Sequence, residues 1–241
     1  MRDLGWSGYF NARDLGGLPT SLSPTGSTIF KRIARGPRRE LLTDEGWDEA
    51  RHWGLSTVVD LRCAYEVGTR EGDPQIDEDS LSGLVIVNAP PEDQDDPEFR
   101  EVCFPILDSP AYWRHNWRIL PHLVRETLQV IANAEVGVLV HCSAGRDRTG
   151  MISALLLGNA GVSPEDVAED YAQSVRAGAG AKTHAPTQDR QASWSAAQVD
   201  QWIIETTPIV RETAAHTDVA FDAIGLPQEA RKRLRAILTQ A

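Results

Sequence analysis

Residues 136–150 read Val136-Gly137-Val138-Leu139-Val140-His141-Cys142-Ser143-Ala144-Gly145-Arg146-Asp147-Arg148-Thr149-Gly150, and this stretch decides the fold. Its first part is a short, valine-rich apolar run, which is typical of a buried strand. A loop with a cysteine, a glycine and two arginines follows, and the apolar segment 151–160 then predicts a helix that ends at Gly161. A strand, a short loop and a helix N-terminus together predict a cradle for a phosphate group.

The rest of the chain alternates short apolar runs with segments of helical periodicity. The pattern predicts an α/β fold with a central, mostly parallel sheet, flanking helices and a helical C-terminal third. Further strands are predicted at 29–33, 55–62 and 84–88. Helices are predicted at 43–53, 113–131 with a break at Pro121, 163–175, 196–205, 208–216 and 227–238.

The composition is that of one globular domain spanning 1–241. Of the 241 residues, 41% are hydrophobic and 24% are charged. Residues 177–193 contain few large apolar side chains, so we expect a mobile loop there that acts as a lid over the site. No apolar run reaches the roughly 18 residues that cross a bilayer, and the start lacks the apolar core of a secretory signal.

Three cysteines are too few for a disulfide framework, which favours a reducing compartment. We therefore expect a cytoplasmic protein, although export by a non-classical route stays open. The net charge is −11, and ten acidic residues with no Lys or Arg lie within 71–99. This segment is interpreted as a solvated surface, or as a surface that repels nucleic acid and acidic membranes. Without a basic stripe, no nucleic-acid partner is predicted.

The loop pairs a nucleophile with a cation. Cys142 lies at a predicted helix N-terminus near Arg148, where positive charge favours the thiolate over the thiol. A thiolate can attack phosphorus and form a phosphocysteine intermediate. The planar guanidinium of Arg148 fits two phosphate oxygens, and the hydroxyl of Thr149 is suited to donate to the sulfur.

The remaining loop residues are predicted to bind substrate. Backbone N–H groups of Ser143, Ala144 and Gly145 are expected to point at the phosphate, and Gly145 allows close approach of the backbone. Arg146 is expected to bind or orient the substrate. His141 is interpreted as a residue that orients the loop rather than as a base, because a thiolate needs no base.

A general acid must protonate the leaving oxygen, and three aspartates are candidates. They are Asp147 inside the loop, Asp60 at a strand end and Asp108 before a helix. Asp60 and Arg62 have two interpretations of equal weight. They line a ligand crevice at the carboxyl ends of parallel strands, with Arg62 binding substrate, or they form a salt bridge that closes the strand.

Three segments carry a family resemblance, in the same order along the chain. They are Asn11-Ala12-Arg13-Asp14-Leu15-Gly16-Gly17, Val59-Asp60-Leu61-Arg62 with Glu66, and His141-Cys142-Ser143-Ala144-Gly145-Arg146-Asp147-Arg148-Thr149-Gly150. The last resembles the signature loop of cysteine-dependent protein-tyrosine phosphatases. Together the three resemble the atypical bacterial tyrosine phosphatases, of the kind that mycobacteria secrete. Arg146 departs from that pattern, which usually has lysine there, so the charge is kept with a different reach.

The resemblance implies a tyrosine-phosphatase-like α/β fold with no metal and no cofactor. It also implies activity on phosphotyrosine in proteins, with side activity on phosphoserine, phosphothreonine or phosphoinositides. The resemblance makes Asp147 the first choice of acid, because family members with a Lys-Asp-Arg loop carry an aspartate there. Asp60 is the second choice and Asp108 the third.

Two other functions compete with this one. A rhodanese-like sulfurtransferase also uses a loop cysteine, but the set of Gly145, Arg148 and Thr149 favours phosphorus chemistry. A phospho-binding module without turnover is the non-enzymatic alternative.

Overall fold

The computed structural model describes residues 2–180 and 190–240. Their strands form a five-stranded sheet in the order β1-β2-β5-β3-β4. Strands β2, β5, β3 and β4 run parallel, and β1 pairs with β2 antiparallel. The strands are β1 (Arg13–Asp14), β2 (Ile33–Gly36), β3 (Thr57–Asp60), β4 (Val85–Asn88) and β5 (Val138–His141). The predicted α/β class with a mostly parallel sheet is confirmed.

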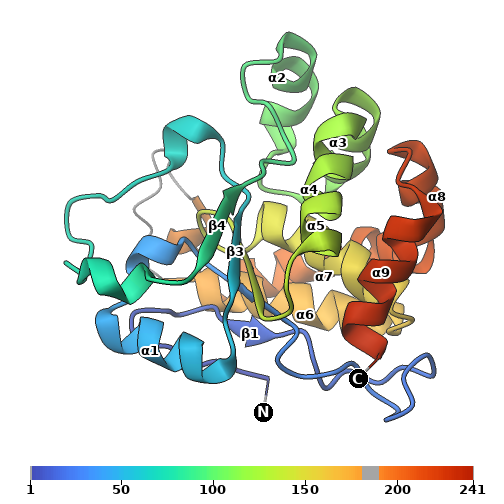
Figure 1. Ribbon diagram of the computed structural model, residues 1–241. Helices are drawn as coiled ribbons and strands as arrows, with labels where there is room; N and C mark the ends of the chain where they lie inside the picture. Colours follow the sequence, from blue (N-terminus) through green and yellow to red (C-terminus); the bar gives the residue numbers. More distant parts are fainter. Residues whose placement is uncertain (1, 181–189, 241) are drawn as a thin grey trace.

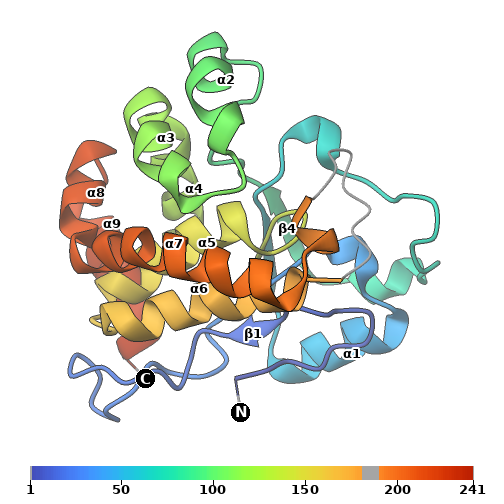
Figure 2. The ribbon, with the colours of Figure 1, turned by 180° about the vertical axis from the view of Figure 1, so that it is seen from behind.

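Helices cover the sheet unevenly, with α1 on one side and most others gathered on the opposite side (Figures 1 and 2). Within the described ranges no helix is long and apolar enough to cross a membrane. The α-helices are α1 (Asp44–Trp53), α2 (Pro97–Cys103), α3 (Trp113–Ile119), α4 (Pro121–Asn133), α5 (Asp147–Asn159), α6 (Pro164–Gly178), α7 (Ala196–Ala215), α8 (Thr217–Ala223) and α9 (Gln228–Thr239).

The two sides of the sheet belong to two apolar clusters, because successive residues of a strand point to opposite faces. In β5, Val138 and Val140 pack into the large cluster with the helices of the C-terminal half. Leu139, between them, packs into a smaller cluster with Trp47 and Trp53 of α1. A strand buried on both faces explains the continuous apolar run before Cys142.

Several predicted boundaries are confirmed. Thr43 caps α1 by accepting a hydrogen bond from the Gly46 N–H, and Gly54 ends the helix with a left-handed φ of 112°. Ser163 caps α6 in the same way. Pro121 separates α3 from α4, as expected of a residue that cannot continue a helical hydrogen-bond ladder.

Two strand predictions are wrong in part. The strand predicted at 29–33 begins only at Ile33, because Lys31 has a left-handed φ of 63° that interrupts an extended chain. The strand at 84–88 exists as β4, but it is not buried, since Val85 is 58% and Ile86 38% exposed. It is the last strand in the sheet order, so it has one neighbour.

The helix boundaries in the C-terminal third also differ from the prediction. The helices predicted at 196–205 and 208–216 are one helix, α7, with Pro208 in its interior. Packing of buried Val210 and Ala214 in the core compensates for the hydrogen bond that proline removes. The sequence pattern missed α8, and it missed α2, which begins at the end of the acidic segment.

The loop predicted at 177–193 falls largely on residues 181–189, which lie outside the described residues. At its two ends, α6 continues to Gly178 and a 3₁₀ helix spans Arg190–Ser193. The lid therefore stays a prediction. The assignment of a single domain also stays a prediction.

Candidate active site

The site is built where the central strand of the sheet ends. Strand β5 lies between β2 and β3 in parallel register, so their carboxyl ends meet at one edge. The loop of residues 142–146 leaves β5 at this edge and enters α5, which begins at Asp147, four residues earlier than the apolar pattern predicted. Cys142, the first loop residue, is 2% exposed.

The carbonyl groups of residues 143–145 are all held from outside the loop. They accept hydrogen bonds from the Arg38 N–H at Ser143 (3.0 Å), from Asn11 Nδ2 at Ala144 (3.1 Å) and from Arg35 Nη2 at Gly145 (2.8 Å). The N–H groups of the same three residues donate to no acceptor in the described part of the chain. This arrangement leaves the amides available to an anion, in agreement with the predicted phosphate cradle.

Gly145 is required at its position for two reasons. Its φ of 70° is left-handed, and a Cβ there would lie 2.5 Å from the carbonyl oxygen of Gly36. The close approach is therefore to the end of strand β2. The sequence had suggested a close approach to the phosphate instead.

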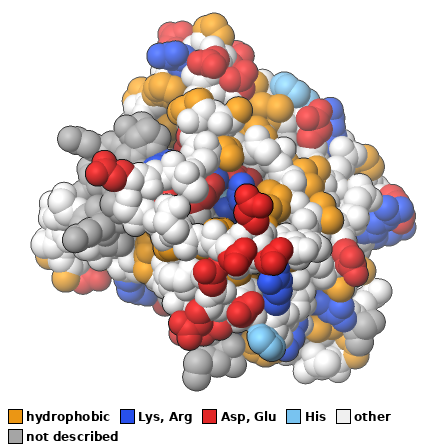
Figure 3. Space-filling model, turned by 60° about the vertical axis from the view of Figure 1, so that its left-hand side comes forward, with side chains coloured by type: hydrophobic (Ala, Val, Ile, Leu, Met, Phe, Trp, Pro, Cys, Tyr) orange, Lys and Arg blue, Asp and Glu red, His pale blue; other side chains and the backbone are white. Residues whose placement is uncertain are grey.

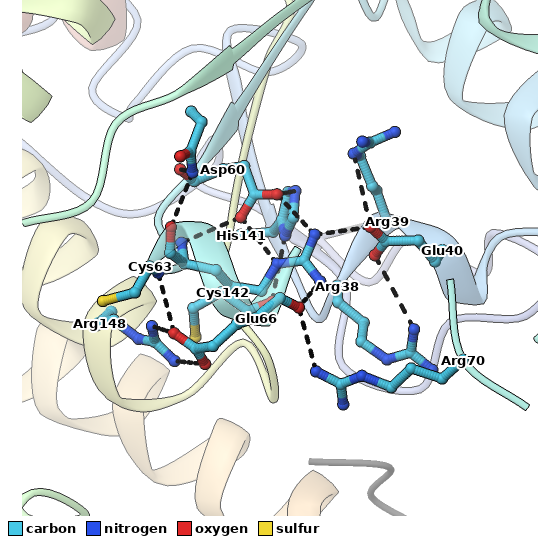
Figure 4. A network of polar contacts seen from close by, with 12 residues as sticks. Arg38, Arg39, Glu40, Asp60, Cys63, Glu66, Arg70, His141, Cys142 and Arg148 are labelled. Carbon is cyan, nitrogen blue, oxygen red and sulfur yellow. Dashed lines mark hydrogen bonds and ion pairs between the residues drawn. The ribbon is translucent and has the colours of Figure 1, made fainter. Parts of the chain in front are cut away.

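Arg148 is held by two buried carboxyl groups, and Figure 4 shows its contacts with one of them, Glu66. Its Nη2 donates to Glu66 Oε1 at 2.8 Å, its Nη1 donates to Glu66 Oε2, and its Nε lies 3.5 Å from Glu92 Oε1. Burial raises the pKa of Glu66, but the hydrogen bonds from Arg148 outweigh it and the pKa is lowered. Glu66 is thus an anion that fixes the guanidinium plane.

Residue chemistry alone did not identify Glu66 or Glu92 as residues of the site. Glu66 ends the 3₁₀ helix Ala64–Glu66 and also accepts the N–H of Cys63 at 3.0 Å, a pattern that the sequence suggested only through the family resemblance. Glu92 is 2% exposed, and burial raises its pKa despite the nearby Arg148. Nothing separates Glu92 in the sequence from the solvated acids around it.

Asp60 and Arg62 form the predicted salt bridge. Both carboxylate oxygens of Asp60 accept hydrogen bonds from Arg62, at 2.9 and 2.6 Å, and Arg62 also binds Glu40 at 2.7 Å. Burial raises the pKa of Asp60, but the hydrogen bonds and charge of Arg62 outweigh this effect and the pKa is lowered, so the group is held as an anion. The Arg62 side chain is fully buried. These contacts argue against Asp60 as an acid and against direct substrate binding by Arg62.

His141 is a buried neutral ring. Its Nδ1 lies 3.2 Å from the carbonyl oxygen of Cys142, and its Nε2 lies 3.7 Å from Asp60 Oδ2. Burial lowers its pKa, and Asp60 opposes this only in part. The ring therefore links the Asp60 salt bridge to the loop backbone, in line with an orienting role.

The two other acid candidates come from different segments, Asp147 from the start of α5 and Asp108 from the loop before the 3₁₀ helix Pro110–Tyr112. The carboxylate of Asp147, 21% exposed, accepts from Nε and Nη2 of Arg146, both at 3.2 Å. Asp108 accepts hydrogen bonds from Gln191 at its backbone oxygen (3.1 Å) and its carboxylate (3.5 Å). Burial raises the pKa of the Tyr171 phenol, and the negative charges of Asp147 and Asp108 add to this rise.

Thr149 lies in the first turn of α5. Thr149 Oγ1 is buried and has no hydrogen-bond partner in the described part of the chain. The predicted bond from this hydroxyl to the sulfur stays a prediction.

Acidic side chains gather on one face of the molecule, around a hollow that contains basic atoms (Figure 3). Over residues 2–180 and 190–240, no cluster of three or more His, Cys, Asp or Glu side chains could hold a metal ion.

A sequence model of the tyrosine phosphatase family matches residues 4–240. The triple specificity protein phosphatase PtpB of Mycobacterium tuberculosis is 27% identical over 191 residues, covering 69% of this chain and 67% of that protein. A tyrosine-protein phosphatase of Nostoc commune is 29% identical, covering 55% of this chain and 45% of the relative. A putative tyrosine-protein phosphatase of Cupriavidus necator is 28% identical, covering 71% and 63%. The chain thus matches about half to two thirds of the length of these relatives.

Two solved structures are similar to this chain at low identity. The core catalytic domain of the PP-IP phosphatase SIW14 of S. cerevisiae is 15% identical with a TM-score of 0.38, covering 78% of this chain and 94% of that one. Tk-PTP in its active form is 22% identical with a TM-score of 0.28, covering 72% and 92%.

Proposed function

The chain belongs to the tyrosine phosphatase family, and on this premise we propose that it hydrolyses phosphotyrosine through a phosphocysteine intermediate on Cys142. The observation that carries the proposal is the anchored loop. Its carbonyl groups at 143–145 are all bonded outward, while its amides lack protein acceptors in the described residues. Such a loop binds the three non-bridging oxygens of a phosphoryl group beside the thiolate.

In the first step, the Cys142 sulfur forms a bond to phosphorus as the bond from phosphorus to the ester oxygen breaks. The leaving oxygen takes a proton from Asp147, our proposed general acid. Arg148 holds two phosphoryl oxygens with the N–H groups that Glu66 does not occupy. Because Glu66 fixes the guanidinium in advance, little reorganisation is needed as charge develops.

In the second step, water attacks phosphorus and the sulfur–phosphorus bond breaks. Asp147, now a carboxylate, accepts a proton from the water, and inorganic phosphate and the thiolate are the products. The buried Thr149 hydroxyl, which has no hydrogen-bond partner among residues 2–180 and 190–240, is suited to donate to the departing sulfur. A partner of this kind stabilises the thiolate as a leaving group.

The substrate class is part of the proposal. Phosphotyrosine in a protein is the primary substrate, with phosphoserine, phosphothreonine and phosphoinositides as side substrates. The name of the mycobacterial relative, a triple specificity phosphatase, supports this wider range. Arg146 and Asp147 form an ion pair where the loop joins α5, and we propose that they orient the substrate. The cytoplasmic location rests on cysteine content and stays a prediction.

The test is the variant Cys142→Ser, assayed with p-nitrophenyl phosphate and a phosphotyrosine peptide. We expect turnover to disappear, because a serine hydroxyl is a far weaker nucleophile, while inorganic phosphate still binds to the loop. Turnover that survives the substitution would rule out the phosphocysteine mechanism. Sulfur transfer from thiosulfate in excess of phosphate release would instead support a sulfurtransferase.

A further inference from the structure

A buried carboxylate lies behind the catalytic loop, on helix α6. Asp170 is 1% exposed and accepts hydrogen bonds or ion pairs from three arginines: Arg2, Arg13 (Nε–Oδ1 3.3 Å) and Arg35. The three cations lower the pKa of Asp170 although burial opposes them. Asp170 is therefore an anion at the centre of a cluster that brings the N-terminal segment, β2 and α6 together.

Arg35 connects this carboxylate to the catalytic loop directly. Its Nη1 donates to Asp170 Oδ2, and its Nη2 donates to the carbonyl oxygen of Gly145 at 2.8 Å. The Arg35 side chain is 1% exposed. Burial lowers its pKa to about 10, and Asp170 acts against this shift. The guanidinium is thus a buried cation that joins the carboxylate of Asp170 to the loop.

Arg13 provides a second connection through Asn11. Its Nη2 donates to the backbone oxygen of Asp170 (2.8 Å) and to Ser174 Oγ (2.6 Å), both on α6. Its Nη1 donates to Asn11 Oδ1 at 2.7 Å, which fixes the amide so that Nδ2 faces the loop. Nδ2 then donates to the carbonyl oxygen of Ala144 at 3.1 Å.

We propose that Asp170 is a positioning residue for the phosphatase reaction, which sets the direction of the loop amides through Arg35 and through Arg13 with Asn11. The inference rests on the proposed function. The carbonyl of each peptide unit fixes the N–H of the following residue on the opposite side, because the peptide is planar. Holding the carbonyl groups of Ala144 and Gly145 from behind therefore aims the next amides at the phosphate.

The neighbouring Glu169 provides a control for Asp170. Glu169 lies one residue earlier on α6, and its side chain is 53% exposed and paired with Arg176 at 2.7 Å. Asp170→Asn keeps the size of the side chain but removes the charge that orders three arginines, whereas Glu169→Gln removes the same charge from the surface. The two variants form a matched pair.

The experiment measures inhibition by orthovanadate, an oxyanion that fills the loop in a geometry close to the transition state. We expect its inhibition constant in Asp170→Asn to rise at least tenfold, about as much as kcat/KM falls, because misdirected amides lose transition-state contacts. Glu169→Gln should stay within about twofold of the wild type. An inhibition constant does not depend on the fraction of folded enzyme, so a purely structural role would leave it unchanged.

An unchanged vanadate inhibition constant in Asp170→Asn, or an equal rise in both variants, would overturn the inference. If Asp170→Asn does not fold, Asn11→Ala tests the same network at its loop end and is expected to raise the constant severalfold. An unchanged constant in that variant would also overturn the inference. Turnover by the wild type, and its loss in Cys142→Ser, is measured before these variants. If the wild type shows no turnover, or if Cys142→Ser keeps it, the proposed function fails and not the role of Asp170.

Discussion

Gly145→Ala tests how closely catalysis depends on the position of the loop. An alanine at a φ of 70° carries a backbone penalty of about 1–2 kcal/mol. Its Cβ would also lie 2.5 Å from the carbonyl oxygen of Gly36, about 0.9 Å short of the 3.4 Å at which ordinary contact begins. Gly36 is paired with His141 in the β2–β5 ladder, so the loop must move and the strand cannot.

A displacement of nearly 1 Å is large for a catalytic loop. Misplacing a catalytic group by about 1 Å costs on the order of 100-fold in rate, so we expect kcat/KM to fall about 100-fold. Gly26→Ala is the matched control, because Gly26 has a similar φ of 76° but no atom within 4 Å of an added Cβ. It should lose about 1 kcal/mol of stability and keep wild-type kcat/KM.

The assay is steady-state hydrolysis of p-nitrophenyl phosphate by both variants, with the folded fraction measured by urea unfolding. If Gly145→Ala keeps kcat/KM within about threefold of Gly26→Ala, the loop tolerates a shift of this size and the reasoning is refuted. A loss of folded protein that accounts for the whole decrease would refute it as well.

Two further predictions concern carboxyl groups of the site. Asp147→Asn should lower kcat by roughly 100-fold for phenyl phosphate and much less for p-nitrophenyl phosphate, because a general acid matters most for poor leaving groups. Asp60→Asn and Asp108→Asn should show no such leaving-group dependence, and a dependence in either would assign the acid to that residue. Burial raises the pKa of Glu92, so its ionisation above about pH 4.3 weakens the folded state. Glu92→Gln should therefore gain stability over the wild type at pH 8 but not at pH 4 in urea unfolding, and an equal difference at both pH values would contradict this.

Short-range patterns in the sequence predicted several helix boundaries correctly. Thr43 and Gly54 marked the ends of α1, and Pro121 marked the break between α3 and α4, because caps and helix breakers act within one turn of the chain. Patterns failed where packing outweighs local preference. Pro208 lies inside α7, and β4 carries an apolar sequence on an exposed edge.

The sequence alone identified the proposed catalytic loop, because a strand, Cys142, Gly145, Arg148 and a helix start within fifteen residues are a local pattern. Tertiary structure alone decided which charges hold that loop. Glu66 contacts Arg148 across 82 residues, and the Arg35 bridge joins Gly145 and Asp170 across 110 and 135 residues. A buried carboxylate is specified by the side chains that surround it after folding, so no spacing along the chain distinguishes Asp170 or Glu92 from a solvated acid.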